Sequence, residues 1–403
     1  MATETKTFRL PTLAGSGSST LAETRKATEE AIGTALKRLG GVSPSFAFLF
    51  VAPRHDLGVA LSVAERSLAG AAVMGCTTAG EITERGLTRG GVSALVVSSA
   101  DTEVAVRATS EVKSDPAGAA RRLCEGFGSA VKGAAGRGLS HSTSVVLADG
   151  LNGAGEQLVN EMMTATRPFQ QVVGGAAGDD GAFQATSVGG GGRAHRDGAA
   201  VLHAFSRLPW GVGVVHGLEA TTRPMRVTRA SGNVVHELDG RPAFDVYKDY
   251  ARERGLALEA ATAGPFLIGN ELGILVFDEI KRARAPLSVG PDGSLSCAAG
   301  IPEGAHVAIL DGKPANMVAA ARKAAEEAHR NLRGARAAAV LLFDCVCRGM
   351  ILDKEFAREI EAVQSVFPGV PVAGLLTYGE IARFKGRLEG WHNTTAVVAA
   401  IPA

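Results

Sequence analysis

One pattern occurs three times along this 403-residue chain: an apolar strand, a helix, a second apolar strand and a glycine-rich loop that ends in a carboxylate. The copies span residues 46–82, 144–180 and 337–381. In each, roughly 25 to 30 residues lie between the first strand and the loop, the length of one strand–helix–strand crossover. The repeat predicts an α/β fold of strand–helix–strand–loop units, which form mixed sheets with covering helices.

The loop of each copy carries a shared signature. It reads Gly-x-x-x-x-Gly-Glu at Gly75–Glu81 and Gly374–Glu380, and a version one residue shorter occurs at Gly175–Asp180. Strand–helix–strand units are common, so a coincidental repeat is the alternative, and the shared signature argues against it. An apolar run follows each loop as a further strand. The run after the first loop and residues 102–109 predict an antiparallel pair.

Such loops are suited to holding a ligand. Ligands of α/β sheets bind beyond the carboxyl ends of the strands, where glycine allows a sharp turn. A carboxylate there can cap the N–H groups of its own turn or bind a ligand's amine or guanidinium, and both interpretations stay open. The set predicts a crevice lined by two or more loops, with the candidate residues Cys76, Thr77, Gly80, Glu81, Gly175, Asp179, Asp180, Gly379 and Glu380.

Two further side chains follow strands of the third copy. Arg348 has a planar guanidinium that suits a carboxylate or phosphate ligand, and a salt bridge to Asp344 or Glu380 is the alternative. Tyr378 interrupts a run of small residues, which suits either a ligand wall or simple packing. Glycine-rich residues 188–198 lack the Lys-Ser/Thr of a phosphate loop and no helix follows them. They predict a hairpin turn, and we exclude nucleotide binding there.

Length and composition set the domain division. A chain of 403 residues is expected to form two domains. Residues 1–20 are rich in Thr, Gly and Ser and are expected to be frayed. We place two pseudo-similar α/β domains at 21–238 and 239–403, because Asp239 and Pro242 suit the start of a helix.

Charge and cysteine content narrow the class of protein. The formal net charge of +1 indicates no field that would draw the chain to nucleic acid or to an anionic membrane. No run approaches the ~18 apolar residues of a membrane span. Five cysteines follow no framework or metal-ligand spacing. These features predict a reduced cytoplasmic protein without a metal site, and they do not determine the oligomeric state.

Several blocks together resemble a known family. "VMGCTTAGEI" (73–82) is similar to the signature of the FIST domain, a bacterial sensory domain also found in eukaryotic F-box proteins. "VVGGAAGDDGAF", "DGSLSCAAGIPEGAHVAIL", "FDCVCRGMIL" and "VAGLLTYGEIARFKG" resemble successive blocks of paired FIST N and FIST C regions, from about residue 43 to the end. The resemblance implies a sensor of small molecules such as amino acids, which acts on histidine kinases or cyclic-di-nucleotide enzymes. A subgroup binds haem and senses nitric oxide.

Two classes of function therefore compete. The first is a non-catalytic sensor without catalytic residues or a cofactor, which passes its signal to a separate partner because no output segment is recognised in the sequence. Its variant is the haem-binding nitric-oxide sensor, although no haem-attachment or paired-histidine motif favours it. The second is an acyl-transfer enzyme, in which Cys76 is the nucleophile, His392 the base and Asn393 the group that orients it. His392 and Asn393 are also candidate ligand contacts for the sensor.

Overall fold

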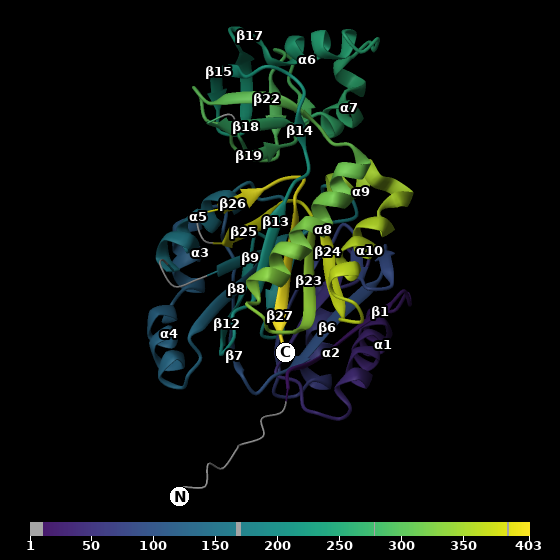
Figure 1. Cartoon of the computed structure of the whole chain (residues 1–403), viewed down its shortest axis with the longest axis vertical. Coiled ribbons are helices and arrows are strands. Elements are labelled where there is room, and N and C mark those ends of the chain that lie inside the picture. Colours follow the sequence, from purple (N-terminus) through teal and green to yellow (C-terminus); the bar gives the residue numbers. More distant parts are fainter. Residues whose placement is uncertain (1–10, 167–170, 278, 385–386) are drawn as a thin grey trace, which may run out of the picture.

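Three sheets of one design form the body of the protein (Figure 1). The computed structural model describes residues 11–166, 171–277, 279–384 and 387–403. Within these residues, each of the three sheets contains an antiparallel edge, a central parallel pair joined through a helix, and a short hairpin at the other edge. The predicted α/β class with mixed sheets and covering helices is confirmed.

In spatial order, the first sheet contains β1 (Leu13–Ser19), β6 (Val92–Ser98), β2 (Phe46–Val51), β3 (Ala72–Thr77), β10 (Val188–Gly190) and β11 (Arg193–His195). The second contains β7 (Thr102–Thr109), β12 (Ala199–Ser206), β8 (His141–Ala148), β9 (Gln171–Ala176), β25 (Glu380–Phe384) and β26 (Arg387–His392). The third contains β13 (Gly211–Val215), β27 (Ala396–Pro402), β23 (Ala337–Cys345), β24 (Val372–Thr377), β4 (Glu81–Thr83) and β5 (Gly86–Thr88).

Each repeat unit gives its hairpin to another unit's sheet. The hairpin β4–β5 of the first unit pairs with β24 of the third, β10–β11 of the second pairs with β3 of the first, and β25–β26 of the third pairs with β9 of the second. The exchange is cyclic, so the body has pseudo-threefold symmetry. The predicted pair of β6 with β7 is wrong. Both sides of β6 are already occupied by β1 and β2, and β7 pairs with β12 instead.

Equivalent glycines mark the repeat in three dimensions. In each parallel pair one glycine lies opposite a carbonyl of the neighbouring strand, and a Cβ there would approach that oxygen to between 1.9 and 2.6 Å. The pairs are Gly75 with Leu49, Gly174 with Val146, and Gly374 with Leu342. In the second unit the equivalent glycine is therefore Gly174 rather than Gly175.

The three sheets share one core. Alternate residues of β2 point inward, where Phe46, Phe48 and Phe50 join side chains from the second and third sheets. The opposite faces are covered by helices: α1 (Thr24–Leu36) and α2 (Leu57–Ser67) on the first sheet; α3 (Pro116–Leu123), α4 (Phe127–Gly136) and α5 (Gly155–Thr166) on the second; α8 (Pro314–Asn331), α9 (Val346–Leu352) and α10 (Ala357–Val366) on the third. Burial on both faces explains the continuous apolar runs of the sequence.

The expectation of a frayed N-terminus is wrong for β1. This strand pairs with β6 over seven residues. Its glycines are explained by packing: a Cβ on Gly15 or Gly17 would lie about 2 Å from the backbone oxygens of Ala35 or Ala31 in α1. The glycines of this stretch allow a helix to lie directly on a strand, and β13 has the same arrangement beneath α8.

A smaller domain is inserted in the third unit, between β13 and α8, and lies above the body in Figure 1. It comprises β14 (Glu219–Ala220), β15 (Met225–Ser231), β16 (Val234–Leu238), β17 (Arg241–Pro242), α6 (Ala243–Arg252), α7 (Gly264–Gly269), β18 (Leu272–Val276), β19 (Glu279–Arg284), β20 (Pro286–Val289), β21 (Leu295–Cys297) and β22 (His306–Asp311). The predicted division at 238/239 falls between β16 and β17, which pair. The domain division at 238/239 therefore stays a prediction.

Buried Arg284 fastens this domain to the body. Its guanidinium donates to the carboxylate of Glu156 in α5 at 2.8 Å and to the carbonyl of Trp391 in β26 at 3.2 Å. It also donates to the carbonyl of Gly300 within the small domain at 3.0 Å. A fully buried arginine needs such a set of acceptors, because an unpaired charge there would be costly.

Candidate functional site

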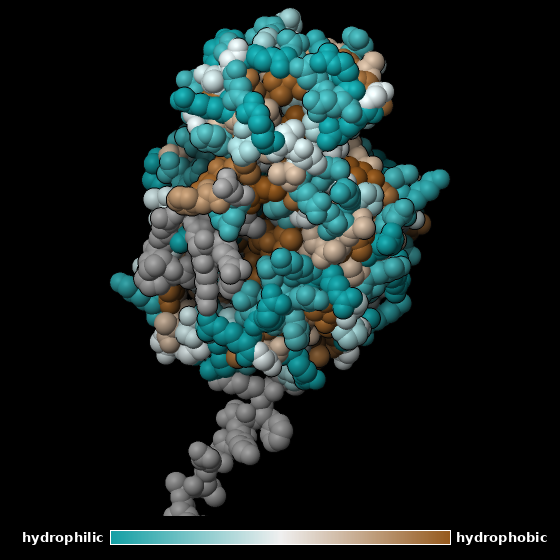
Figure 2. All heavy atoms as spheres, turned by 45° about the horizontal axis from the view of Figure 1, so that its top comes forward, coloured by the Kyte–Doolittle hydropathy of each residue, from teal (hydrophilic) through white to brown (hydrophobic). Residues whose placement is uncertain are grey.

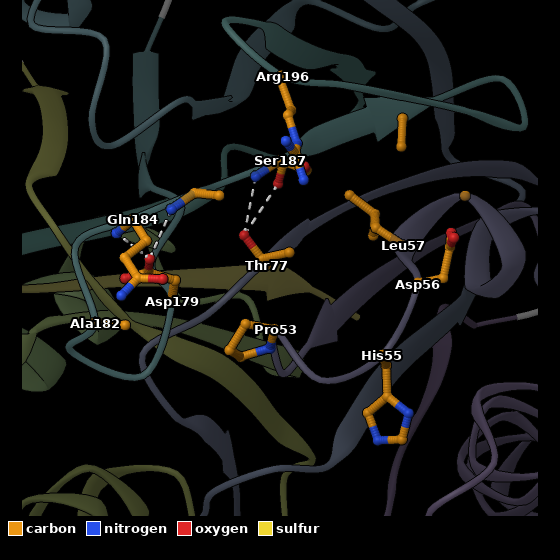
Figure 3. A pocket seen from close by; sticks show the side chains of 13 residues that line it. Pro53, His55, Asp56, Leu57, Thr77, Asp179, Ala182, Gln184, Ser187 and Arg196 are labelled. Atoms are coloured by element: carbon orange, nitrogen blue, oxygen red, sulfur yellow. Dashed lines mark hydrogen bonds between the residues drawn. The ribbon is translucent and has the colours of Figure 1, made fainter.

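A pocket of about 450 Å³ lies at the carboxyl ends of the parallel strands β2 and β3 (Figure 3). We call it the first pocket. It is lined by Pro53, His55, Asp56, Leu57, Gly58, Thr77, Asp179, Ala182, Gln184, Ala185, Ser187, Ala194 and Arg196. The loop after β2 and the start of α2 form one wall, and the loop 177–187 of the second unit forms the other. Of the candidate residues, Thr77 and Asp179, which come from the first two signature loops, line this pocket. That these loops hold a ligand stays a prediction.

Asp179 shapes the loop 177–187. Its carboxylate accepts hydrogen bonds from the backbone N–H groups of Phe183, Gln184 and Ala185, at 2.8, 2.6 and 2.9 Å. The hydroxyl of Tyr378 donates to the same carboxylate. Burial alone would raise the pKa of Asp179, but the hydrogen bonds from Tyr378 and these N–H groups outweigh it and lower the pKa. Asp179 is therefore ionised, and its hydrogen bonds hold the conformation of the loop 177–187.

Tyr378 latches this loop to the third unit. Its hydroxyl also accepts from the N–H of Gly181 at 2.9 Å. Its ring stacks on Phe183, with centroids 4.6 Å apart. Burial and the neighbouring Asp179 raise the pKa of the Tyr378 hydroxyl, which keeps it a neutral donor. We call this arrangement the Asp179–Tyr378 latch.

Free polar groups remain on the first pocket. Arg196 is exposed, and among the described residues its guanidinium has no hydrogen-bond or ion-pair partner. In Figure 3 its side chain extends toward Ser187. Leu57 and Gly58 form the first turn of α2, where the backbone N–H groups and the helix dipole favour a negative charge. The pocket can thus receive an anionic group.

Glu81 and Glu380 cap their own loops. Glu81 accepts from Thr78 and from the N–H of Gly91, and Glu380 makes the equivalent bonds with Thr377 and the N–H of Thr395. Both are fully buried, and neither lines the first pocket. Burial raises the pKa of Glu81 to about 7 and that of Glu380 well above its ordinary value. The expectation that they face a common pocket is wrong, because loop N–H groups use these carboxylates.

Arg348 is a structural ion-pair residue. It is fully buried, and its guanidinium pairs with Asp344 at 2.8 Å and with Glu359. It also donates to the carbonyls of His216 at 2.7 Å and Met317 at 2.9 Å. The salt-bridge alternative with Asp344 is correct, and the predicted ligand role is not supported, because these acceptors occupy the whole guanidinium.

The thiol of Cys76 is not placed for catalysis. It faces the shared core, and burial raises its pKa far above the ordinary value. A thiol that stays protonated is a poor nucleophile. Its proposed partner His392 lies on β26 of another sheet. There it is opposite Glu380 in the register of β25 and β26, and it is only 2% exposed. The buried, protonated thiol of Cys76 argues against the Cys76–His392–Asn393 arrangement.

The remaining predicted residues support the loops. Gly80 has φ +146° and lies against Leu376. Gly175 lies against Thr377, and a Cβ on Gly379 would meet the Trp391 ring at 2.4 Å. The backbone N–H of Asp180 donates to the carbonyl of Thr78 at 3.0 Å, which joins the first two units.

A second pocket, of about 90 Å³, lies between the body and the small domain. It is lined by Gly150, Leu151, Phe183, Ile268, Ala285, Leu287, Ala298, Cys345, Val346, Cys347, Met350, Tyr378 and Asn393. Tyr378 and Asn393 are thus brought to one cavity, apart from the first pocket. A third, of about 560 Å³, lies between Glu156 of α5 and the small domain, lined largely by apolar residues such as Ile274 and Val276.

Sequence reasoning missed Arg196, which lies within the stretch dismissed as a hairpin turn. The signal was weak: arginines after a glycine run give no hint that β10–β11 pairs with β3 and brings Arg196 to the first pocket.

A search of the described part of the chain finds neither a metal-ligand cluster nor a helix that could span a membrane. Among those residues, no group of three or more His, Cys, Asp or Glu side chains is arranged to hold a metal ion. No helix in the same ranges is long and apolar enough to cross a membrane.

The body and its pockets define an α/β protein with cavities at strand ends and at the junction with the inserted domain. Comparison with family models identifies it further. Residues 45–241 match the FIST N domain and residues 243–383 match the FIST C domain, so the chain belongs to the FIST family. FIST domains are associated with sensory binding of small ligands in signalling.

The similar proteins that follow assign no activity to this chain. An uncharacterized protein of Methanocaldococcus jannaschii is 35% identical over 82 residues, which cover 20% of this chain and 16% of that protein. Uncharacterized proteins of Mycobacterium bovis and Mycobacterium tuberculosis are each 29% identical over 204 residues, 48% of this chain and 51% of theirs. The chain thus spans about half, or less, of these relatives. A crystal structure of cyanuric acid hydrolase from A. caulinodans aligns with a TM-score of 0.28 at 10% identity, over 49% of this chain and 72% of that one, and is too distant to carry an argument.

Proposed function

We propose that this protein is a non-catalytic sensor that binds a small carboxylate-bearing metabolite, such as an amino acid, in the first pocket. The observation that carries the proposal is the guanidinium of Arg196, which is left without a partner among the described residues, on a cavity at the carboxyl ends of β2 and β3. A charge-assisted bond to a carboxylate would satisfy this guanidinium. The first turn of α2 would add backbone donors to the same anion.

The other wall of the pocket suits the rest of an amino acid. Asp56 accepts from the N–H of Val59 through one carboxylate oxygen, at 2.9 Å, and its second oxygen can accept from a ligand ammonium. Ser187 and Gln184 add neutral polar groups. A pocket with both an arginine and an aspartate favours a zwitterion over a simple anion.

The loop 177–187 supplies a route for the signal. It lines the first pocket through Gln184 and Ser187 and the second through Phe183, and the latch connects it to the third unit. Binding that orders this loop would change the surface presented next to the small domain. We propose that a separate partner, a histidine kinase or a cyclic-di-nucleotide enzyme, responds to that change.

The alternatives have less support. A haem needs an axial ligand that faces a large cavity, and the only histidine lining the three pockets described, His55, has a ring that points away from Thr77 and Ser187 in Figure 3. Sulfur and phenol groups line only the second of these three pockets, whose 90 Å³ is too small for a haem. The residues that line these three pockets therefore do not fit a haem.

Arg196→Gln is the direct test. Calorimetric titration and thermal-shift assays with amino acids and other carboxylic acids should identify ligands of the wild-type chain, and saturation at 100 times Kd adds about 2.7 kcal/mol of stability. Arg196→Gln should weaken the best ligand by about 10- to 100-fold, because a hydrogen bond to a charged group contributes ~1.5–3 kcal/mol. Arg193→Gln, also exposed and in the same hairpin but outside the pocket lining, is the matched control. Equal affinity in Arg196→Gln and wild type would refute the assignment.

A further inference from the structure

The second pocket differs in chemistry from the first. No acidic or basic side chain lines it; apolar groups form most of its wall, and only Tyr378, Asn393 and two thiols are polar. The hydroxyl of Tyr378 already serves the latch. A charged ligand would lose its hydration there without compensation, so the pocket favours a neutral molecule.

Exposed apolar side chains surround its entrance. Phe183, Leu287 and Met350 are 47%, 42% and 44% exposed, and all three line this one pocket. They come from the loop 177–187, from β20 and from α9, so they gather only in the folded protein. Figure 2 shows apolar residues along the junction between the small domain and the body. Exposed apolar side chains that gather at a cavity indicate a binding surface rather than scattered exposure.

Phe183 is held at this entrance against its own preference. It has φ +52°, a backbone conformation that is costly for a bulky residue. The bond from its N–H to Asp179 and the stacking on Tyr378 maintain that conformation. Strain of this kind is found where a side chain is positioned for a function.

Asn393 provides a polar group in the pocket that nothing in the described part of the chain satisfies. Its side chain is 2% exposed, and its Oδ1 is buried without a hydrogen-bond partner. Its backbone carbonyl, by contrast, accepts from the hydroxyl of Thr395 at 2.9 Å. A buried carbonyl oxygen without a donor is costly, so a bound molecule that brings a donor to this side chain would be stabilised.

We propose that the second pocket binds a neutral, mostly apolar small molecule with a terminal hydroxyl or primary amide. The polar end donates to Oδ1 of Asn393, and the hydrocarbon part lies against Phe183, Leu287 and Met350. A cavity of about 150 Å³ holds benzene, so 90 Å³ accepts a head of a few heavy atoms and leaves the chain in the entrance. This site differs in position and in ligand chemistry from the anion site proposed for the first pocket.

The site joins three parts of the fold. Its walls come from the second unit, the third unit and the small domain, which contributes Ile268, Ala285 and Ala298. An occupant contacts all three parts and fills the junction between the body and the small domain. Occupation is therefore expected to stabilise the attachment of the small domain, which Arg284 otherwise maintains by its hydrogen bonds.

The test uses primary alcohols from ethanol to 1-hexanol, hexanamide and hexanoate with the full chain. Titrations followed by ligand-observed NMR should show saturable binding of 1-hexanol and hexanamide, with affinity that rises with chain length, and at least tenfold weaker binding of hexanoate. Ala298→Leu fills the cavity and should abolish saturable binding. Asn393→Leu should weaken the binding of 1-hexanol by about three- to tenfold, because one neutral hydrogen bond is lost.

Control variants distinguish binding in the second pocket from nonspecific binding to apolar surface. Leu287→Ala should reduce the increase in affinity with alcohol chain length. Leu256 is an exposed leucine outside the pocket, so Leu256→Ala should leave this increase unchanged. Arg196→Gln should leave 1-hexanol binding unchanged, so failure of the proposed function and failure of this site remain distinguishable. Binding of 1-hexanol should also slow modification of Cys347 by methyl methanethiosulfonate, which gives a readout if Asn393→Leu fails to fold. Equal binding to wild type and Ala298→Leu, or equal affinity for hexanoate and 1-hexanol, overturns the proposal.

Discussion

Removal of one hydroxyl should loosen the loop that forms a wall of the first pocket. Tyr378→Phe keeps the ring that stacks on Phe183 and deletes the bond to the Asp179 carboxylate and the acceptor for the N–H of Gly181. A hydrogen bond to a charged group contributes ~1.5–3 kcal/mol. The opening equilibrium of the loop 177–187 should therefore shift by about 10- to 100-fold toward the open form. The global fold should remain, because Asp179 keeps three backbone donors.

Hydrogen exchange measures this opening directly. The amides of Phe183, Gln184 and Ala185 should exchange about 10- to 100-fold faster in Tyr378→Phe, and ligand affinity at the first pocket should fall with them. The defect should shrink below pH 3.8, because a carboxylate whose folded pKa is lowered contributes stability above the ordinary pKa and loses it on protonation. Tyr250→Phe, which removes a neutral bond to Thr221 in the small domain, is the control. Unchanged exchange in Tyr378→Phe would show that the latch does not hold the loop.

Buried groups give three further predictions. Because the folded-state pKa of Glu81 is raised to about 7 from 4.5, its contribution to stability is present below pH 4.5 and is lost as pH rises through 7. Urea unfolding of wild type should therefore show a loss of about 2 kcal/mol from this group between pH 5 and pH 7.5, and Glu81→Gln should remove that loss. Arg284→Met should lower stability by ~3–5 kcal/mol and expose the small-domain junction to limited proteolysis, and an unaltered digestion pattern would contradict this. Gly374→Ala should cost about 3 kcal/mol or more, since its Cβ would lie 1.9 Å from the Leu342 carbonyl oxygen, whereas Gly33→Ala in α1 meets no atom within 4 Å and should stabilise slightly, as thermal unfolding can check.

Local patterns in the sequence predicted much of the fold. Apolar runs bounded by glycine predicted β2, β3, β8, β9, β23 and β24, and helical periodicity predicted the helices between them. These signals are reliable because strands buried on both faces and amphipathic helices impose their periods on neighbouring residues. The repeated loop signature likewise predicted that equivalent turns follow the parallel pairs, and the FIST resemblance is confirmed by both family regions.

The candidate site was predicted only in part. Thr77 and Asp179 line the first pocket, because strand ends in an α/β sheet converge at one edge, and their contact with a ligand stays a prediction. Glu81, Glu380 and Arg348 are buried instead. A charged residue in a loop has the same appearance in the sequence whether it meets a ligand or an N–H group of its own fold. Only the acceptors and donors that surround it in space distinguish the two cases.

The sequence by itself determined the units: which residues form strands, which form helices, and where glycine must allow close backbone approach. Tertiary structure alone decided how the units combine, because the hairpins β4–β5, β10–β11 and β25–β26 each pair with the sheet edge of a different unit. That exchange carries Arg196 to the first pocket and Tyr378 to Asp179, across 197 to 199 residues for the Tyr378 contacts. No local period encodes contacts at such separation, so the pockets exist only once the three sheets have closed around their shared core.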